Sequence, residues 1–187
     1  MRKVAVVVGS LRRESINLRF AKALARLAEG RMVFDLVDLS DVPLYNDDLW
    51  QQPAAGVLRL KRELDAADAV LFVTPEYNRS IPAVTKNVVD WGSRPYGQNS
   101  WAGKPAAIVG TSPGAIGTAV AQAQLRSILV GCGVRLLGQP EVYFQTKAGL
   151  IADDFSIADD KTRAFLAGFI AKFADHIERV AARSSTP

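Results

Sequence analysis

Short runs of apolar, mostly β-branched residues alternate along this chain with longer stretches in which apolar positions recur every three or four residues. The continuous runs predict strands buried on both faces of a parallel sheet, and the longer stretches predict amphipathic helices. The predicted strands cover residues 4–8, 32–39, 69–74, 105–111 and 134–137, the last continuing near Val142. The predicted helices cover residues 15–29, 57–68, 81–91, 118–130 and 159–182.

Strands and helices alternate one for one, which is typical of right-handed crossovers in a doubly wound α/β domain. We therefore expect a five-stranded parallel sheet with helices on both faces. The length of 187 residues fits one domain, spanning 1–187. Ligands of such sheets bind beyond the carboxyl ends of the strands. Three polar loops follow the first, third and fourth strands at that edge, GSLRRESIN, TPEYNRSIP and GTSPGAIGT, and we expect them to converge.

The first loop contains the donors of a phosphate site. Ser10, Ser15 and Asn17 offer neutral donors, Arg12 offers a fork suited to phosphate oxygens, and the N–H groups that open the following helix face the same place. Its single glycine matches neither the dinucleotide fingerprint nor a P-loop. The alternative is that Ser15 only caps the helix and that Arg12 and Arg13 are solvated, and this loop alone leaves both interpretations open.

The second loop favours a flat ligand. Pro75 fixes the backbone where Glu76, Tyr77 and Asn78 must project around a cavity edge. Tyr77 offers a flat apolar face with a polar tip, and the exposed backbone of the loop can bind the edge of a heteroaromatic ring. The alternative is a turn acid at Glu76 and a core aromatic residue at Tyr77.

The third loop allows a close backbone approach at Ser112 and Gly114. A ligand with a ring and a phosphate, lying across all three loops, explains the three sequences together. Flavin mononucleotide (FMN) has that shape.

Composition excludes several classes of function. The chain is 49% hydrophobic and 22% charged, and its net charge of +4 is too small to indicate nucleic-acid binding. Its single cysteine, Cys132, and single histidine, His176, exclude an internal disulfide and a Cys/His metal site, and both are interpreted as packing or surface residues. No signal peptide or membrane span is expected, so we predict a soluble, cytoplasmic protein with no metal, nucleic-acid or membrane partner.

The segments GSLRRESIN, PEYNRSIPAVTKNVVDW and SPGAIG together resemble the NAD(P)H-dependent FMN reductase family, in particular its chromate- and quinone-reductase branch. This resemblance implies a flavodoxin-like fold with sheet order 2-1-3-4-5, noncovalent FMN, NAD(P)H as co-substrate, and a homodimer or homotetramer. The chain departs from the family at residues 83–86, where AVTK replaces a more usual Gly followed by Leu-Lys.

The resemblance also implies roles for individual residues. The phosphate would be held by Ser10, Arg12, Ser15 and Asn17, and the isoalloxazine ring would contact Pro75, Glu76, Tyr77, Asn78, Ser112 and Gly114. No side chain needs to be a nucleophile, because flavin N5 carries the hydride. Arg94 is a candidate contact for an anionic acceptor or for the NADPH phosphate, with a helix-end cation as the alternative. Residues 43–48 and Trp50 are candidates for a subunit contact.

The expected activity is reduction of quinones, and of chromate, free flavin or azo compounds, by hydride transfer through bound FMN. Two alternatives remain at this point. A flavodoxin-type electron carrier would use the same fold and cofactor, but such carriers tend to be acidic and this chain is basic. A non-enzymatic nucleotide- or phosphate-binding module would explain the first loop and leave the PEYN loop without a role.

Overall fold

The computed structural model describes residues 1–184, and the predicted domain boundary at residue 187 lies outside them. The strands are β1 (Arg2–Val8), β2 (Met32–Leu36), β3 (Ala69–Val73), β4 (Pro105–Ser112), β5 (Arg135–Leu136) and β6 (Val142–Gln145). The helices are α1 (Ile16–Ala28), α2 (Ala55–Ala66), α3 (Ala83–Gly92), α4 (Ala119–Gly131) and α5 (Asp160–Ser184), with a short 3-10 helix η1 (Asp47–Gln51). Each predicted helix is therefore present, with its ends shifted by a few residues.

The sheet is parallel throughout and its strand order is β2-β1-β3-β4-β5, which confirms the expected order 2-1-3-4-5. The fifth position is interrupted. β5 pairs with the start of β4, and β6 pairs with its end, from Val109 opposite Val142 to Ser112 opposite Gln145. Pro140 lies in the gap and has no N–H, so it cannot donate a ladder bond at that point.

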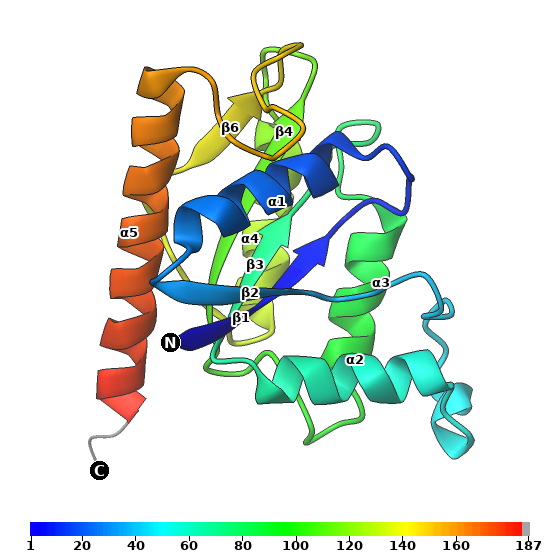
Figure 1. Cartoon of the computed structure of the whole chain (residues 1–187). Coiled ribbons are helices and arrows are strands. Elements are labelled where there is room, and N and C mark those ends of the chain that lie inside the picture. Colours follow the sequence, from blue (N-terminus) through cyan, green and yellow to red (C-terminus); the bar gives the residue numbers. More distant parts are fainter. Residues whose placement is uncertain (185–187) are drawn as a thin grey trace.

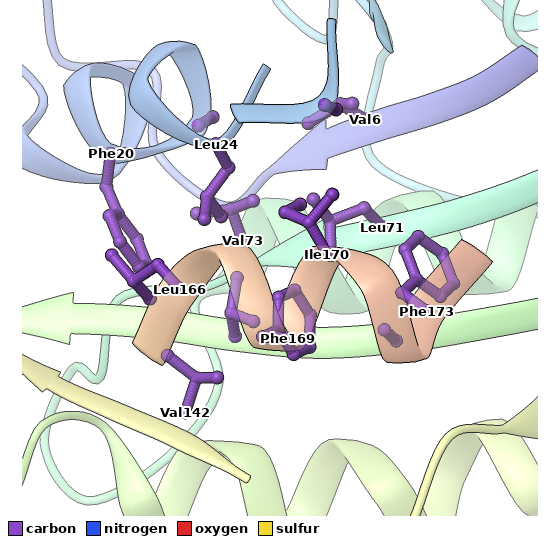
Figure 2. Close-up of a cluster of buried hydrophobic side chains, with 14 of the residues drawn as sticks. Val6, Phe20, Leu24, Leu71, Val73, Val142, Leu166, Phe169, Ile170 and Phe173 are labelled. Carbon is purple, nitrogen blue, oxygen red and sulfur yellow. The ribbon is translucent and has the colours of Figure 1, made fainter. Parts of the chain in front are cut away.

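Two layers of helices cover the sheet. α1 and α5 lie on one face (Figure 1), where Phe20 and Leu24 of α1 meet Leu166, Phe169 and other side chains of α5 (Figure 2). These four side chains are at most 1% exposed and belong to the hydrophobic core on this face. Full burial of each such side chain contributes about 1.5–3 kcal/mol to folding.

The other face is covered by α2, α3 and α4. Its core contains Leu60 of α2, Trp91 of α3 and Leu125 of α4, together with Trp101, all fully buried. The indole N–H groups of the two tryptophans donate to the backbone carbonyls of Pro43 and Val89, so neither polar group is left without a partner.

Strand β2 is shorter than the expected strand over residues 32–39. It ends at Leu36, and only the N–H of Val37 still reaches the sheet, at 3.0 Å from the carbonyl of Val6. Beyond it the chain crosses to η1, with Asn87 of α3 bonded to the backbone of Pro43 and Tyr45. Among the described residues, no helix has the length and apolar character that crossing a membrane requires.

Candidate functional site

Three loops leave the sheet at one edge, because β1, β3 and β4 are adjacent and parallel. We call residues 9–15 loop 1, residues 74–82 loop 2 and residues 112–118 loop 3. The strands are in register at their carboxyl ends, where Val8 lies opposite Val73 and Val73 lies opposite Val109. The ladder continues one residue further, since Gly9 and Thr74 each donate an N–H to the neighbouring strand at 2.9 Å. The predicted convergence of the three loops at this edge is therefore present.

Gly9 lets loop 1 pass close to α3 and to the base of loop 2. A Cβ atom at Gly9 would lie 2.4 Å from Oγ1 of Thr85 and 3.1 Å from Cδ of Pro75. Gly110 does the same between β4 and loop 2, since its Cβ would lie 2.2 Å from the carbonyl oxygen of Thr74. The two glycines therefore allow close packing of loop 1, loop 2 and α3 at the edge of the sheet.

The end of loop 1 and the first residues of α1 contain a row of open N–H groups, meaning backbone N–H groups without a hydrogen-bond acceptor among the described residues. The Oγ of Ser15 accepts from the N–H of Leu18 at 3.2 Å and caps α1. Within residues 1–184, no acceptor faces the backbone N–H groups of residues 13–17. Such groups, at the positive end of a helix dipole, form an anion site. The capping interpretation of Ser15 is therefore confirmed, and its role as a phosphate contact stays a prediction.

The two arginines of loop 1 are exposed. Arg12 lies beside Glu14, with 3.7 Å between guanidinium nitrogen and carboxylate oxygen, and both side chains are more than 70% accessible. An ion pair this exposed contributes little to stability, so the guanidinium of Arg12 is available to a ligand. Ser10 is partly buried, and its Oγ accepts only a long bond, 3.4 Å, from the N–H of Arg12.

The side chain of Asn17 is buried and hydrogen-bonded within the protein. It is 1% exposed, and its amide makes two hydrogen bonds with the backbone of Thr111, donating to the carbonyl at 3.0 Å and accepting from the N–H at 3.0 Å. The side chain thus joins the start of α1 to the end of β4. Its role as a phosphate contact stays a prediction and depends on its backbone N–H, because the amide is already engaged.

Loop 2 ends in a tight turn. Tyr77 and Ser80 exchange two backbone hydrogen bonds of 3.0 Å, and Asn78 and Arg79 between them have positive φ values of 51° and 62°. Tyr77 is 51% exposed, so the alternative of a core aromatic residue at this position is wrong. Pro75 is buried at the base of the loop, whereas Asn78 is exposed at its tip.

Glu76 caps a helix that begins more than 40 residues later. One of its carboxylate oxygens accepts from the N–H groups of Val120 and Ala121, at 3.0 and 3.1 Å. Thr118, the residue before α4, has a left-handed backbone and makes no side-chain cap of its own. Glu76 therefore supplies the missing cap and fixes loop 2 to the helix that follows loop 3. Its assignment as a ring contact stays a prediction.

Loop 3 is compact and rich in open N–H groups. Oγ of Ser112 donates to the carbonyl of Gly114 at 2.9 Å, which closes the start of the loop. Gly117 has φ +56°, and a Cβ there would lie 2.4 Å from the backbone of Tyr143. In the described chain the N–H groups of Gly114, Ala115 and Ile116 have no acceptor, so they can bind the polar edge of a ring.

Arg94 does not join the three loops within this chain. It follows the carboxyl end of α3, and loop 2 precedes the other end of this ten-residue helix, about 15 Å away along its axis. The condition for its predicted role, a helix that returns beneath the mouth of the site, is therefore not met inside one chain. Its role as a substrate contact stays a prediction.

The single histidine and the single cysteine also lie on elements other than the three loops. His176 is half-buried on α5, with Nε2 at 2.7 Å from the carbonyl oxygen of Arg135. Cys132 is half-buried at the end of α4, and burial raises the pKa of its thiol. Among the described residues, no three His, Cys, Asp or Glu side chains gather as metal ligands would.

Comparison with known proteins gives concordant matches. A family model described as NADPH-dependent FMN reductase matches residues 2–149. A 2-hydroxy-1,4-benzoquinone reductase from a Burkholderia species is 47% identical over 172 residues, 92% of this chain and 94% of that protein. A quinone reductase from Pseudomonas putida is 47% identical over 176 residues, 94% of each chain. The solved structure of FerB, a flavoenzyme NAD(P)H:(acceptor) oxidoreductase from Paracoccus denitrificans, has a TM-score of 0.94 and 52% identity and covers 96% of this chain and 98% of its own.

Proposed function

This chain belongs to the NADPH-dependent FMN reductase family, and from that premise we propose that it is an FMN-dependent NAD(P)H:quinone oxidoreductase. The family makes it an oxidoreductase with FMN as cofactor and NAD(P)H as co-substrate. The observation that carries the proposal in the structure is the row of open N–H groups in loop 1, set beside loops 2 and 3 at one sheet edge.

The residues present fit the phosphate of FMN. The open N–H groups of residues 13–17 and the exposed guanidinium of Arg12 are donors to an anion, and no acidic side chain is buried among them. Charge-assisted hydrogen bonds of this kind contribute roughly 1.5–3 kcal/mol each, so several of them hold a phosphate without a metal ion. Ser10 and Ser15 complete the proposed phosphate site.

We place the isoalloxazine ring between loops 2 and 3. Pro75, Tyr77 and Asn78 would lie along one side of the ring, and Ser112 and Gly114 along the other. The proposal is supported by the half-exposed ring of Tyr77 and by the unpaired N–H groups of residues 114–116. When bound, FMN supplies the redox chemistry, taking a hydride from NAD(P)H and passing two electrons to the acceptor. The protein binds and orients both ligands, and no side chain has to form a covalent bond.

Quinones are the proposed acceptors because two relatives at 47% identity are named for quinone reduction. We extend the proposal to chromate, free flavin and azo compounds, since a flavin face reached from solvent selects weakly among small oxidants. We also propose a cytoplasmic homodimer or homotetramer. The segment of residues 43–48 supports a subunit contact, because Leu44 is 78% exposed on a segment that α3 holds in place.

Anaerobic reduction tests the proposal. The purified protein with FMN is mixed with NADPH without oxygen, and the flavin absorbance should bleach within seconds and return on addition of 1,4-benzoquinone. A flavodoxin-type carrier would keep its absorbance in NADPH, and a phosphate-binding module would not bind FMN at all. Either result would overturn the proposed reductase.

A further inference from the structure

The tip of loop 2 contains an arginine where glycine is the more stable residue. Two consecutive left-handed residues between a hydrogen-bonded pair are the mark of a type I′ turn, and Asn78 and Arg79, at φ 51° and 62°, form one. Asn followed by Gly is the preferred pair for this turn, because Gly takes up the conformation without a steric penalty. Asn78 matches this preference and Arg79 does not.

The surrounding structure holds Arg79 in that conformation. Gln124 of α4 donates its amide N–H to the carbonyl oxygen of Arg79 at 3.0 Å and accepts from Oγ of Ser80 at 2.8 Å. Glu76, at the base of the same loop, is fixed to the N–H groups of α4. Two contacts with α4 therefore make the turn rigid. A strained residue that its neighbours hold in place points to a function for its side chain.

The side chain of Arg79 is a free cation at the rim of the site. It is exposed, and no carboxylate within residues 1–184 lies close enough to pair with it. The nearest acid along the chain, Glu76, is committed to α4. A guanidinium keeps its charge at all working pH values and presents its donors in a planar fork that fits phosphate.

We propose that Arg79 makes this enzyme favour NADPH over NADH by binding the 2′-phosphate. The inference rests on the proposed function, in which the nicotinamide lies against a ring held between loops 2 and 3. NADPH differs from NADH only by that phosphate dianion. When the nicotinamide lies on the ring, the adenosine end of the long NAD(P)H molecule has to extend away from the ring and past the tips of the loops. Quinones carry no phosphate, so Arg79 leaves their reduction unaffected.

The test compares three variants of the FMN-loaded enzyme by kcat/KM for NADPH and for NADH, with saturating 1,4-benzoquinone. Arg79→Gly should lower the NADPH-to-NADH ratio about tenfold, the loss of one charge-assisted contact. Arg79→Lys keeps the charge and should keep most of the ratio. Arg62→Ala removes an exposed arginine of α2 and should leave the ratio unchanged, although it alters the net charge equally.

Two further readouts separate charge from strain. Arg79→Gly should raise Tm by about 2–4 °C because glycine relieves the turn, whereas Arg79→Lys should leave Tm unchanged. Added salt should lower the ratio of the parent enzyme and leave that of Arg79→Gly unaffected, since ions screen an exposed contact. Equal ratios in the parent and in Arg79→Gly would overturn this inference alone. A parent protein that oxidises neither nicotinamide overturns the proposed function and this inference with it.

Discussion

At the scale of single residues, the site depends on side chains that form hydrogen bonds with distant backbone groups of the same chain. The amide of Asn17 is fully engaged with the backbone of Thr111, 94 residues away, and the carboxylate of Glu76 with the backbone of α4, 44 and 45 residues away. From the sequence alone, polar residues near a predicted binding site are easily interpreted as contacts with the ligand. Here two of them first hold the loops in place, which is a condition for any ligand contact.

We predict that Asn17→Ala destabilises the protein strongly. The change leaves the N–H and the carbonyl of Thr111 buried without partners, which should lower the free energy of unfolding by about 2–4 kcal/mol. Denaturant unfolding of the FMN-free protein measures the loss without a contribution from the ligand. Asn46→Ala serves as the control, because Asn46 makes one exposed bond at the start of η1. A loss no greater than that of the control would contradict the role of Asn17 as a connection between α1 and β4.

At the scale of elements, loop 2 supplies the N-terminal cap of α4. Its first residue follows Thr118, which has φ 71° and provides no side-chain cap, and Gly110 and Gly117 before it allow tight contacts with neighbouring backbone. The cap comes from Glu76 instead. Loop 2, loop 3 and α4 therefore form one unit, and a change in the cap should alter the ring side of the site more than the phosphate side.

We predict that Glu76→Ala lowers the stability of the FMN-free protein by about 0.5–2 kcal/mol, the usual effect of losing an N-terminal cap. Glu76→Gln keeps an oxygen acceptor for the same N–H groups and should lose less. Both variants should weaken binding of riboflavin, which lacks the phosphate, by the same factor as binding of FMN, measured by flavin fluorescence titration. Full stability in the Glu76→Ala protein would show that the cap is dispensable.

At the scale of the whole molecule, one ion-pair network joins segments from both ends of the chain. Arg2 of β1 bonds to Asp68, which precedes β3, and to Glu178 of α5, and Asp68 also accepts from the N–H of Lys3. Burial raises the pKa of Asp68, but the bonds from Lys3 and Arg2 outweigh it and leave that pKa below its ordinary value. Arg2 likewise lowers the pKa of Glu178.

We predict that this network makes the fold sensitive to acid. A carboxylate with a lowered pKa in the folded state stabilises the protein fully above its ordinary pKa of about 4, and this contribution is lost as the pH falls through the lower, folded-state value. The Tm deficit of Asp68→Asn relative to the parent should therefore be full at pH 7 and shrink below about pH 4. Asp35→Asn, at an exposed carboxylate that makes no hydrogen bond or ion pair within residues 1–184, is the control. A deficit for Asp68→Asn that stays constant with pH would contradict the prediction.

The sequence by itself determined the architecture and the location of the site. Continuous apolar runs such as residues 69–73 can be satisfied only at the centre of a sheet covered on both faces, and their alternation with amphipathic helices permits few topologies. The position of the three loops can also be predicted from the sequence, because the carboxyl ends of parallel strands all lie at the same edge of the sheet. These features can be read from short segments of the sequence, because burial of apolar surface is the main force that determines them.

Only the tertiary structure decided which polar atoms of the loops remain free. In the sequence, Asn17, Glu76 and Arg79 all lie in polar segments that follow predicted strands. In the structure, the side chains of Asn17 and Glu76 bind distant backbone, whereas Arg79 is exposed on a strained turn. Arg94 was placed away from the loops by the direction of α3. Hydrogen bonds between residues far apart in the chain depend on distances of a few tenths of an ångström, and no local pattern of residues encodes them.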